Sequence, residues 1–326
     1  MTTFSSPPRE SDTKKNAIKM PPPSTPPPSF GDLTYWNTRF SSEENFDWLV
    51  ADFTILEPVL RELIEGGKRF VTARVKEDGE DDGGKDGKRP QILHIGCGNS
   101  SLSFRLRGLV DSATQIHNCD YSSVVIERQR QREKKLLQND HAARSGGQEV
   151  QSRWSVLDLL DPEQMANVRK GSDGEYGGED GGGYDIIIDK STTDAISCAE
   201  DVVVGLPYCI NDINTSATAT IPTTVCNQPT FPQKAAIYPP HILAIHLAYL
   251  ARPGCRWVVL SYSSSRFSDW EGEGMPQGLP QPGELWKLVK HEKIVQSPNP
   301  EDKVHRPPEM HHLYILESTG VELKEV

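Results

Sequence analysis

The chain has 326 residues, of which 36% are hydrophobic and 25% charged, and its formal net charge at pH 7 is −11. This length and apolar content are sufficient for one large domain with a single core. The excess of acidic residues, and the lack of a basic run with interleaved aromatic residues, argue against a nucleic-acid partner. Because no stretch has the apolar length of a membrane span or of a signal peptide, we expect no contact with a membrane and a cytoplasmic location.

The first 29 residues are rich in proline, serine and threonine, and they include two runs of three prolines. Such a composition buries too little apolar surface to offset the entropy of ordering. We therefore expect residues 1–29 to form a disordered tail and residues 30–326 to form a single domain. Acidic or glycine-rich stretches and stretches without periodicity predict flexible insertions in that domain, near 76–88, 139–149, 171–183 and 205–238.

Residues 32–63 combine an aromatic cluster with a helical pattern. The aromatic residues are Tyr35, Trp36, Phe40, Phe46, Trp48 and Phe53, and apolar residues then recur at helical spacing from Leu56 to Leu63. Two hypotheses remain open for the aromatic side chains. They either pack a helix against the rest of the domain, or they form a lid over a ligand with an adenine ring or a cationic group.

A glycine turn follows the first predicted strand. The apolar run at 92–95 predicts a buried parallel strand, and the turn containing Gly96 and Gly98 leads into a predicted helix. The first free N–H groups of this helix, near Asn99 and Ser100, would bind a carboxylate or a phosphate.

A second strand, predicted at 114–118, leads to Asp120. An acidic side chain at this edge of a sheet can accept hydrogen bonds from both hydroxyls of a ribose. Ser101 stands where dinucleotide-binding folds usually have a third glycine, which disfavours NAD or FAD and favours S-adenosylmethionine (SAM), a nucleoside without phosphates. The alternative is an ordinary tight turn followed by a solvated aspartate.

The next two strands also deliver acidic side chains to this edge. A strand around 153–156 leads to Asp158 and Leu159; Asp158 either accepts from an adenine amino group or caps the helix at Pro162, for which Asp161 is the better candidate. A central buried strand at 184–188 leads to a further group of polar residues, Asp189, Lys190 and Asp194. For Lys190 the alternative is a surface cation that balances Asp189.

The C-terminal third supplies the remaining elements. A helix is predicted from Pro239 to a stop at Pro253, followed by a strand at 257–260 and an antiparallel pair at 286–295 and 313–316. The chain is therefore expected to form an α/β domain with a mostly parallel sheet of about seven strands, an antiparallel edge, and helices on both faces.

The cysteines and histidines do not predict a metal site. The cysteines, at positions 97, 119, 198, 209, 226 and 255, form no CxxC pair and have no histidine at metal-ligand spacing. Reduced thiols are therefore expected. His311 and His312 are neighbours on a predicted strand and point to opposite faces, and His246 is expected to pack within its helix.

Several motifs in combination resemble the methyltransferase-like protein 13 family. They are Tyr35-Trp36-Asn37-Thr38-Arg39-Phe40, Phe46-Asp47-Trp48, Ile95-Gly96-Cys97-Gly98-Asn99-Ser100, Asp120-Tyr121-Ser122-Ser123-Val124-Val125, Asp189-Lys190 before Thr193-Asp194-Ala195, and Met310-His311-His312-Leu313-Tyr314. Within this family the likeness is greatest to the elongation factor 1-alpha lysine methyltransferases related to the amino-terminal part of an endothelin-converting enzyme 2 transcript.

The resemblance implies a class I SAM-dependent methyltransferase fold, with a Rossmann-like sheet of seven strands. It also implies SAM as the cofactor and the following cofactor contacts: Trp36, Phe40, Trp48, Gly96, Asp120, Tyr121, Asp158, Leu159 and Lys190. Gly98, the second glycine of the turn, is added to these predicted cofactor-binding residues. Two positions depart from the family, because Phe40 replaces a tyrosine of close relatives and Asp189 stands where a glutamate often occurs.

The resemblance further implies methylation of a lysine side chain of a protein, elongation factor 1-alpha. The incoming lysine must lose a proton, and Asp189 or Asp194 are candidates for guiding it and accepting that proton. The strand at 184–188 is not followed by the Asn-Pro-Pro-Tyr motif of nucleobase-methylating enzymes, which disfavours that substrate. Alternatives are a non-catalytic protein that retains the SAM fold for interactions, and a methyltransferase acting on another protein or on a small-molecule amine.

Overall fold

The computed structural model describes only part of the chain. The described residues are 28–44, 53–77, 89–143, 150–171, 183–210, 234–268, 270, 275–276, 279–296 and 309–325. Trp48, nearly all of the predicted tail and most of the predicted insertions lie outside these ranges.

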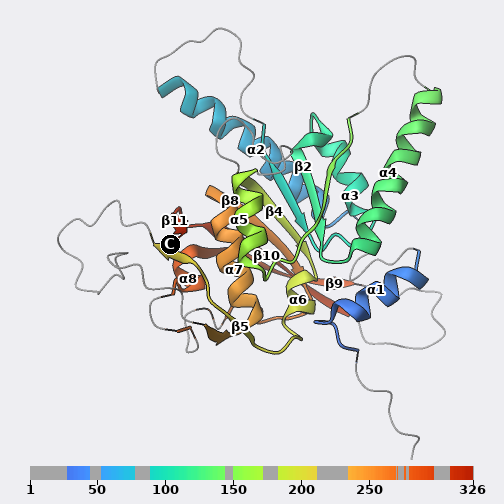
Figure 1. The fold of residues 1–326 in the computed structure, drawn as a ribbon. Coiled ribbons are helices and arrows are strands. Elements are labelled where there is room, and N and C mark those ends of the chain that lie inside the picture. Colours follow the sequence, from blue (N-terminus) through green and yellow to red (C-terminus); the bar gives the residue numbers. More distant parts are fainter. Residues whose placement is uncertain are drawn as a thin grey trace, which may run out of the picture.

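Within the described residues, seven strands form one sheet in the order β3-β2-β1-β4-β8-β10-β9 (Figure 1). Their bounds are β1 Ile92–Ile95, β2 Ile116–Asp120, β3 Arg153–Val156, β4 Tyr184–Lys190, β8 Ala251–Ser261, β9 Trp286–Gln296 and β10 Glu309–Ser318. The strands from β3 to β8 in this order are parallel, whereas β10 runs antiparallel to both of its neighbours, β8 and β9. The predicted seven-stranded, mostly parallel sheet with an antiparallel edge is confirmed.

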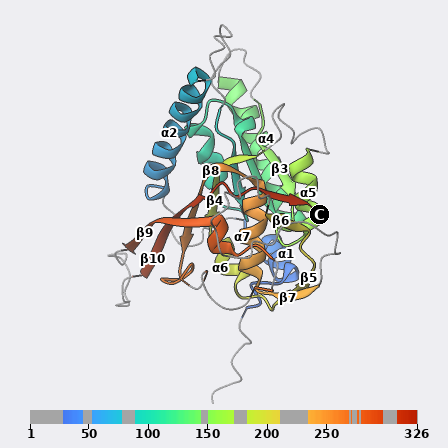
Figure 2. The same ribbon diagram turned by 90° about the vertical axis from the view of Figure 1, so that its left-hand side faces the viewer.

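Helices cover both faces of the sheet, because successive strand residues point to opposite faces and both sets are apolar. On one face, α5 (Pro162–Lys170) and α7 (Pro239–Leu250) pack over a core that includes Leu93 and Ile187. On the other face, α2 (Leu56–Glu77) and α3 (Leu102–Leu106) pack over a core that includes Ile92 and Ile186 (Figure 2). The central strands are thus buried on both sides, as their continuous apolar runs predict.

The remaining elements surround this core. They are α1 Leu33–Ser42, α4 Ser123–Ala143, α6 Thr192–Ile196, α8 Pro282–Leu285, the 3₁₀ turns Arg107–Leu109 and Ala113–Gln115, and the short strands β5 Val202–Val204, β6 Tyr208–Ile210, β7 Ala235–Ile237 and β11 Leu323–Glu325. The short strands form two small antiparallel sheets, β5 with β7 and β6 with β11. Both ends of the predicted insertion at 205–238 are therefore ordered as strands.

Several predicted boundaries were wrong by a few residues. The second strand begins at Ile116 and includes Asp120, because Ser112 caps a 3₁₀ turn with Gln115 that occupies the predicted strand start. Helix α7 ends at Leu250, and Pro253 lies within β8. Helices α2 and α4 continue to residues 77 and 143, into the starts of the insertions predicted at 76–88 and 139–149.

The expectation of reduced thiols was wrong for Cys209, which is disulfide-bonded. The other described cysteines are free, namely Cys97, Cys119, Cys198 and Cys255. Sequence spacing does not reveal such a bond, since disulfide partners are set by the fold. Among the described residues there is no cluster of three or more His, Cys, Asp or Glu side chains that could hold a metal ion. No described helix has the length and apolar character needed to cross a membrane.

Candidate active site

A cavity of about 490 Å³ lies at the carboxyl ends of the parallel strands β3, β2, β1, β4 and β8. Its lining includes most of the residues that the sequence predicts as site residues: Trp36, Phe40, Gly96, Gly98, Asp120, Tyr121, Asp158, Leu159, Lys190 and Asp194. Asp189 is not part of the lining, and Trp48 lies outside the described residues. The structure thus brings together side chains from positions as far apart in sequence as 36 and 194.

The glycine turn after β1 forms one wall of the cavity. Gly96 and Gly98 have φ values of +49° and +53°, a left-handed conformation that favours glycine. A Cβ atom at Gly96 would lie 2.2 Å from Oγ1 of Thr192, whose hydroxyl donates to the carbonyl of Ile95 at 3.0 Å. This turn therefore joins the end of β1 closely to the segment after β4.

Asp120 is buried, and backbone groups hold both of its carboxylate oxygens. Oδ2 accepts from the N–H of Gly98 at 3.1 Å, and Oδ1 accepts from the N–H of Ser122 at 2.9 Å. Each oxygen keeps a second lone pair, which suits two ribose hydroxyls. Burial raises the pKa of Asp120 to about 6, and the two backbone hydrogen bonds oppose this rise.

Trp36 and Phe40 of α1 form an aromatic wall. Their rings stack with centroids 5.5 Å apart, and Nε1 of Trp36 donates to the carbonyl of Phe30 at 2.6 Å. Both side chains line the cavity, and both also belong to a small core cluster with Val125 and Trp154. The two hypotheses for the aromatic residues are therefore compatible at these positions, because the same side chains pack α1 and face the cavity.

The two aspartates after β3 have different roles. Asp161 is the N-cap of α5 and accepts from the N–H groups of Glu163 and Gln164. Asp158 instead lines the cavity, where its Oδ1 accepts from the N–H of Leu160 at 2.9 Å, and burial raises its pKa. The carbonyl of the neighbouring Leu159 accepts a hydrogen bond from Nδ1 of His246. This histidine is buried within α7, as predicted.

Asp189 does not occupy the predicted position of a proton acceptor. Its side chain is fully buried, and its carboxylate accepts from the N–H groups of Thr192 and Thr193 and from the hydroxyl of Thr193. Burial raises the pKa of Asp189 to about 6, and its hydrogen bonds with Thr193 oppose this rise. The carboxylate holds the start of α6 and does not line the cavity, so we no longer assign it a catalytic role.

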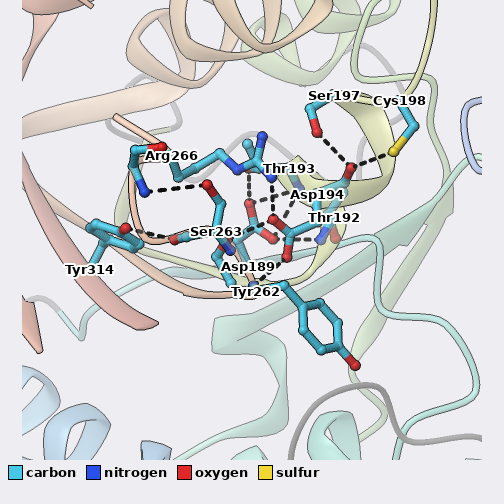
Figure 3. A network of polar contacts seen from close by, with 12 residues as sticks. Asp189, Thr192, Thr193, Asp194, Ser197, Cys198, Tyr262, Ser263, Arg266 and Tyr314 are labelled. Atoms are coloured by element: carbon cyan, nitrogen blue, oxygen red, sulfur yellow. Dashed lines mark hydrogen bonds and ion pairs between the residues drawn. The ribbon is translucent and has the colours of Figure 1, made fainter. Parts of the chain in front are cut away.

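Asp194 lines the cavity and is held by three donors. Its Oδ1 accepts from Oγ of Ser261 and from Nη2 of Arg266, both at 2.6 Å, and its Oδ2 accepts from the N–H of Tyr262 at 3.0 Å (Figure 3). These contacts join α6 to the loop that follows β8. They leave Asp194 charge-paired rather than free to accept a proton.

Several residues of the cavity wall were not predicted. Tyr262, Ser263 and Arg266 line it, together with residues 195–199. Tyr262, Ser263 and Arg266 follow β8, which ends at the same edge as β1 and β4. The rule that ligands bind beyond the carboxyl ends of parallel strands applies equally to this strand, so it was a signal that could have pointed to them.

Ser191 carries backbone strain. Its φ is 66°, and no other described residue besides glycine has a positive φ. Its hydroxyl is buried and has no hydrogen-bond partner among the described residues. Because a Cβ atom disfavours this conformation, Ser191→Gly is expected to raise the free energy of unfolding by about 1 kcal/mol in chemical denaturation. Ser191→Ala retains the strain and should give no such gain. Equal stability of the Gly and Ala variants would contradict the strain.

Comparison with known proteins gives a relative in sequence. No protein-family model matches the chain. Over 184 residues the chain is 32% identical to a Neurospora crassa protein named methyltransferase srdJ, and this match covers 56% of the chain and 60% of the relative. The chain thus spans less than two thirds of the length of that relative.

Among solved structures, the chain is similar to N-methyltransferase NodS from Bradyrhizobium japonicum in complex with S-adenosyl-L-homocysteine, with 12% identity and a TM-score of 0.44 over 89% of this chain and 98% of that one. It is also similar to a SAM-dependent methyltransferase from Anabaena variabilis, with 10% identity and a TM-score of 0.43 over 89% and 94% of the two chains. At this level neither likeness bears on function, and the strand order decides the fold class. The fold is that of the class I SAM-dependent methyltransferases.

The cofactor of the class I methyltransferase fold, SAM, fits the residues of this cavity. Asp120 presents two oriented oxygens for the ribose hydroxyls, and Asp158 presents a carboxylate for the adenine amino group. The stacked rings of Trp36 and Phe40 offer aromatic faces, which attract a sulfonium cation. The glycine turn brings the backbone at Gly98 close to the aromatic wall, since a Cβ atom there would lie 3.7 Å from the Phe40 ring.

Proposed function

We propose that the chain is a SAM-dependent methyltransferase. The observation that carries the proposal is the convergence of Asp120, the glycine turn, the Trp36 and Phe40 wall and Asp158 on one cavity at the carboxyl edge of the sheet. The relative named methyltransferase srdJ supports the same activity.

When bound, SAM would supply an activated methyl group on a sulfonium, whose carbon an acceptor lone pair can attack with the neutral thioether S-adenosyl-L-homocysteine as the leaving group. The residues of the chain orient and desolvate the reactants. Asp120 fixes the ribose and the aromatic wall excludes water, so alignment contributes most of the rate enhancement. Because Asp189 and Asp194 are held by donors from the protein, we assign neither of them the removal of the acceptor proton.

The proposal is tested by isothermal titration of the purified chain with SAM and with S-adenosyl-L-homocysteine. We expect saturable binding of both at one site per chain. A folded chain that binds neither molecule would refute the proposal, whereas binding without turnover on any protein extract would favour the non-catalytic alternative.

For the acceptor, we propose a lysine side chain of a protein, and elongation factor 1-alpha as that protein. The support is the resemblance of the sequence motifs to the methyltransferase-like protein 13 family. A lysine with pKa near 10.4 is uncharged in about one part in a few thousand at pH 7, a cost of about 4 to 5 kcal/mol. Burial near the sulfonium and near Lys190 would lower the pKa of the acceptor amine and reduce this cost.

This substrate proposal predicts methylation of intact elongation factor 1-alpha and poor activity on nucleic acids, small amines and unstructured peptides. Purified chain with labelled SAM is offered the intact factor, total RNA and a histone mixture. Label in RNA alone would refute the lysine proposal, and label in a different protein would refute only the named target. A null-strain proteome remethylated by the chain would then identify that protein by mass spectrometry.

A cytosolic substrate also requires a cytoplasmic location, which we propose with it. The free thiols at Cys97, Cys119, Cys198 and Cys255 support a reducing compartment, and the disulfide at Cys209 opposes it. Thiol labelling of the protein extracted under rapid acid quench measures the state of Cys209 in the cell. Complete oxidation there would contradict the cytoplasmic location.

A further inference from the structure

The loop after β8 forms a part of the cavity wall that the cofactor contacts above do not use. Tyr262, Ser263 and Arg266 of this loop line the cavity together with Asp194 and residues 195–199. In a class I methyltransferase the acceptor must reach the methyl group from a part of the cavity that the cofactor leaves open. The side chains of this loop are therefore placed to contact the acceptor.

Arg266 is held rigidly in this wall by Asp194. Its Nη2 lies 2.6 Å from Oδ1 of Asp194, and the side chains of the two residues are only 15% and 13% exposed. Asp194 is itself fixed by the hydroxyl of Ser261 and the N–H of Tyr262 (Figure 3). The guanidinium is thus placed by a carboxylate that cannot easily turn.

Most of the hydrogen-bonding capacity of Arg266 is unused. A guanidinium has five N–H donors, and across the described residues its one hydrogen bond goes to Asp194. Its Nε is buried without a partner there, and so is Oγ of Ser191, which also lines the cavity. Buried donors without acceptors beside a cavity indicate that a ligand oxygen completes the site.

We propose that the acceptor substrate carries a carboxylate on the same molecule as the methylated amine, either on the lysine itself or on the next residue, and that Arg266 binds this carboxylate. The inference rests on the proposed methyl transfer. A guanidinium that gives one N–H to Asp194 retains others in the planar arrangement that matches a carboxylate. An acceptor ammonium, by contrast, would find Asp194 already paired with Arg266.

The carboxylate that Arg266 binds can come from two kinds of acceptor. One is a small acceptor with its own carboxylate, such as an amino acid. The other is an acidic side chain adjacent to the target lysine of a protein. Arg266 would recognise either, and a purely structural role, in which it only neutralises Asp194, would give neither preference.

The test measures binding of two matched probe pairs to the full chain saturated with S-adenosyl-L-homocysteine. The first pair is Nα-acetyl-lysine and Nα-acetyl-lysinamide, which reports the small-molecule source. The second pair is acetyl-Lys-Asp-amide and acetyl-Lys-Asn-amide, which reports an acidic neighbour. All four probes lack the folded surface of a protein substrate, so we expect weak binding, with the carboxylate member of one pair binding about ten-fold more tightly by ligand-observed NMR. Absence of binding by all four probes at millimolar concentration would overturn the inference. Equal binding within both pairs would overturn the inference.

Variants assign the preference to Arg266. Arg266→Gln should abolish it, and Arg266→Lys should reduce it, because lysine keeps the charge but lacks the planar fork. Arg256→Gln is the control, since Arg256 lies within β8, pairs with Glu317 and does not line the cavity. A preference that survives Arg266→Gln would overturn the inference.

Affinity for S-adenosyl-L-homocysteine serves as the check on folding. If Arg266→Gln does not fold because Asp194 is left unpaired, the double variant Asp194→Asn/Arg266→Gln removes both charges and should also lack the preference. Failure of the wild-type chain to bind S-adenosyl-L-homocysteine would overturn the proposed function and this inference together. Binding of S-adenosyl-L-homocysteine without a carboxylate preference would overturn only this inference.

Discussion

Replacing Gly96 by alanine is expected to weaken S-adenosyl-L-homocysteine binding by more than a hundred-fold. The new Cβ would lie 2.2 Å, 2.7 Å and 2.9 Å from three atoms of the Thr192 side chain, at a φ of +49°. Left-handed strain costs about 1 to 2 kcal/mol, and forcing extra volume into a packed site costs about 1 to 3 kcal/mol. Denaturation should therefore show a loss of about 2 to 5 kcal/mol in the free energy of unfolding. Because Gly96 lines the cavity, displacement of this turn should also appear as loss of binding in calorimetry.

Two variants separate strain from steric clash. Gly98→Ala has a similar φ of +53°, but its Cβ would meet nothing closer than 3.7 Å, so it should lose only the strain contribution to stability. The double variant Gly96→Ala/Thr192→Ala removes the clashing side chain and should recover part of the stability. Wild-type cofactor affinity in Gly96→Ala would show that the close contact between these two segments is unimportant for the site.

The sheet was predictable because its strands are buried on both faces. A strand such as Tyr184–Lys190 contains three consecutive isoleucines, and continuous apolar runs of this length are typical of central parallel strands. The carboxyl-edge rule then placed Asp120, Asp158 and Asp194 together correctly at one cavity. Local pattern and topology were sufficient for this much of the site.

The direction of a side chain at the edge was not predictable from the strand pattern. Asp189 lies at the end of β4 and Asp194 lies five residues later in α6, yet Asp189 turns to the backbone of α6 while Asp194 faces the cavity. The choice depends on whether N–H groups at a following helix start compete for the carboxylate. Thr192 and Thr193, which begin that helix, were the overlooked sign of such a start.

Contacts between distant segments were also beyond the sequence analysis. Arg266 reaches Asp194 across 72 positions of the chain, and no local periodicity links the two. The disulfide at Cys209 is a similar case, since its formation depends on which segments the fold brings together. Pairings of this kind follow from the fold and are invisible to spacing rules.

Replacing Asp120 by asparagine is expected to weaken S-adenosyl-L-homocysteine binding by ten-fold to a hundred-fold. The carboxylate is positioned by the N–H groups of Gly98 and Ser122, so that its remaining lone pairs can accept from two ribose hydroxyls. Loss of such a charge-assisted contact costs about 1.5 to 3 kcal/mol. Titration calorimetry measures the change, and Asp201→Asn, at an exposed acid outside the cavity lining, is the control.

The pH dependence of binding gives an independent test of Asp120. Its pKa is raised from 3.8 to about 6 by burial, so the carboxylate becomes fully ionised only above pH 6. Hydroxyl donors bind the ionised form better, and wild-type affinity should rise with pH through about 6 and then level off. In Asp120→Asn this rise should be absent.

The stability of the ligand-free protein should change in the opposite direction. Between pH 4 and pH 6 the folded chain holds protons on Asp120 and Asp189 that the unfolded chain has released, because both folded pKa values are near 6. The unfolded state binds fewer protons in this window, so the free energy of unfolding contributed by these groups falls as the pH rises. If the pH is raised from 4 to 6, we expect the cofactor affinity to rise while the melting temperature falls, which separates the role of Asp120 in binding from its cost in folding. A cofactor affinity that falls together with the melting temperature would contradict a ribose-binding carboxylate at Asp120.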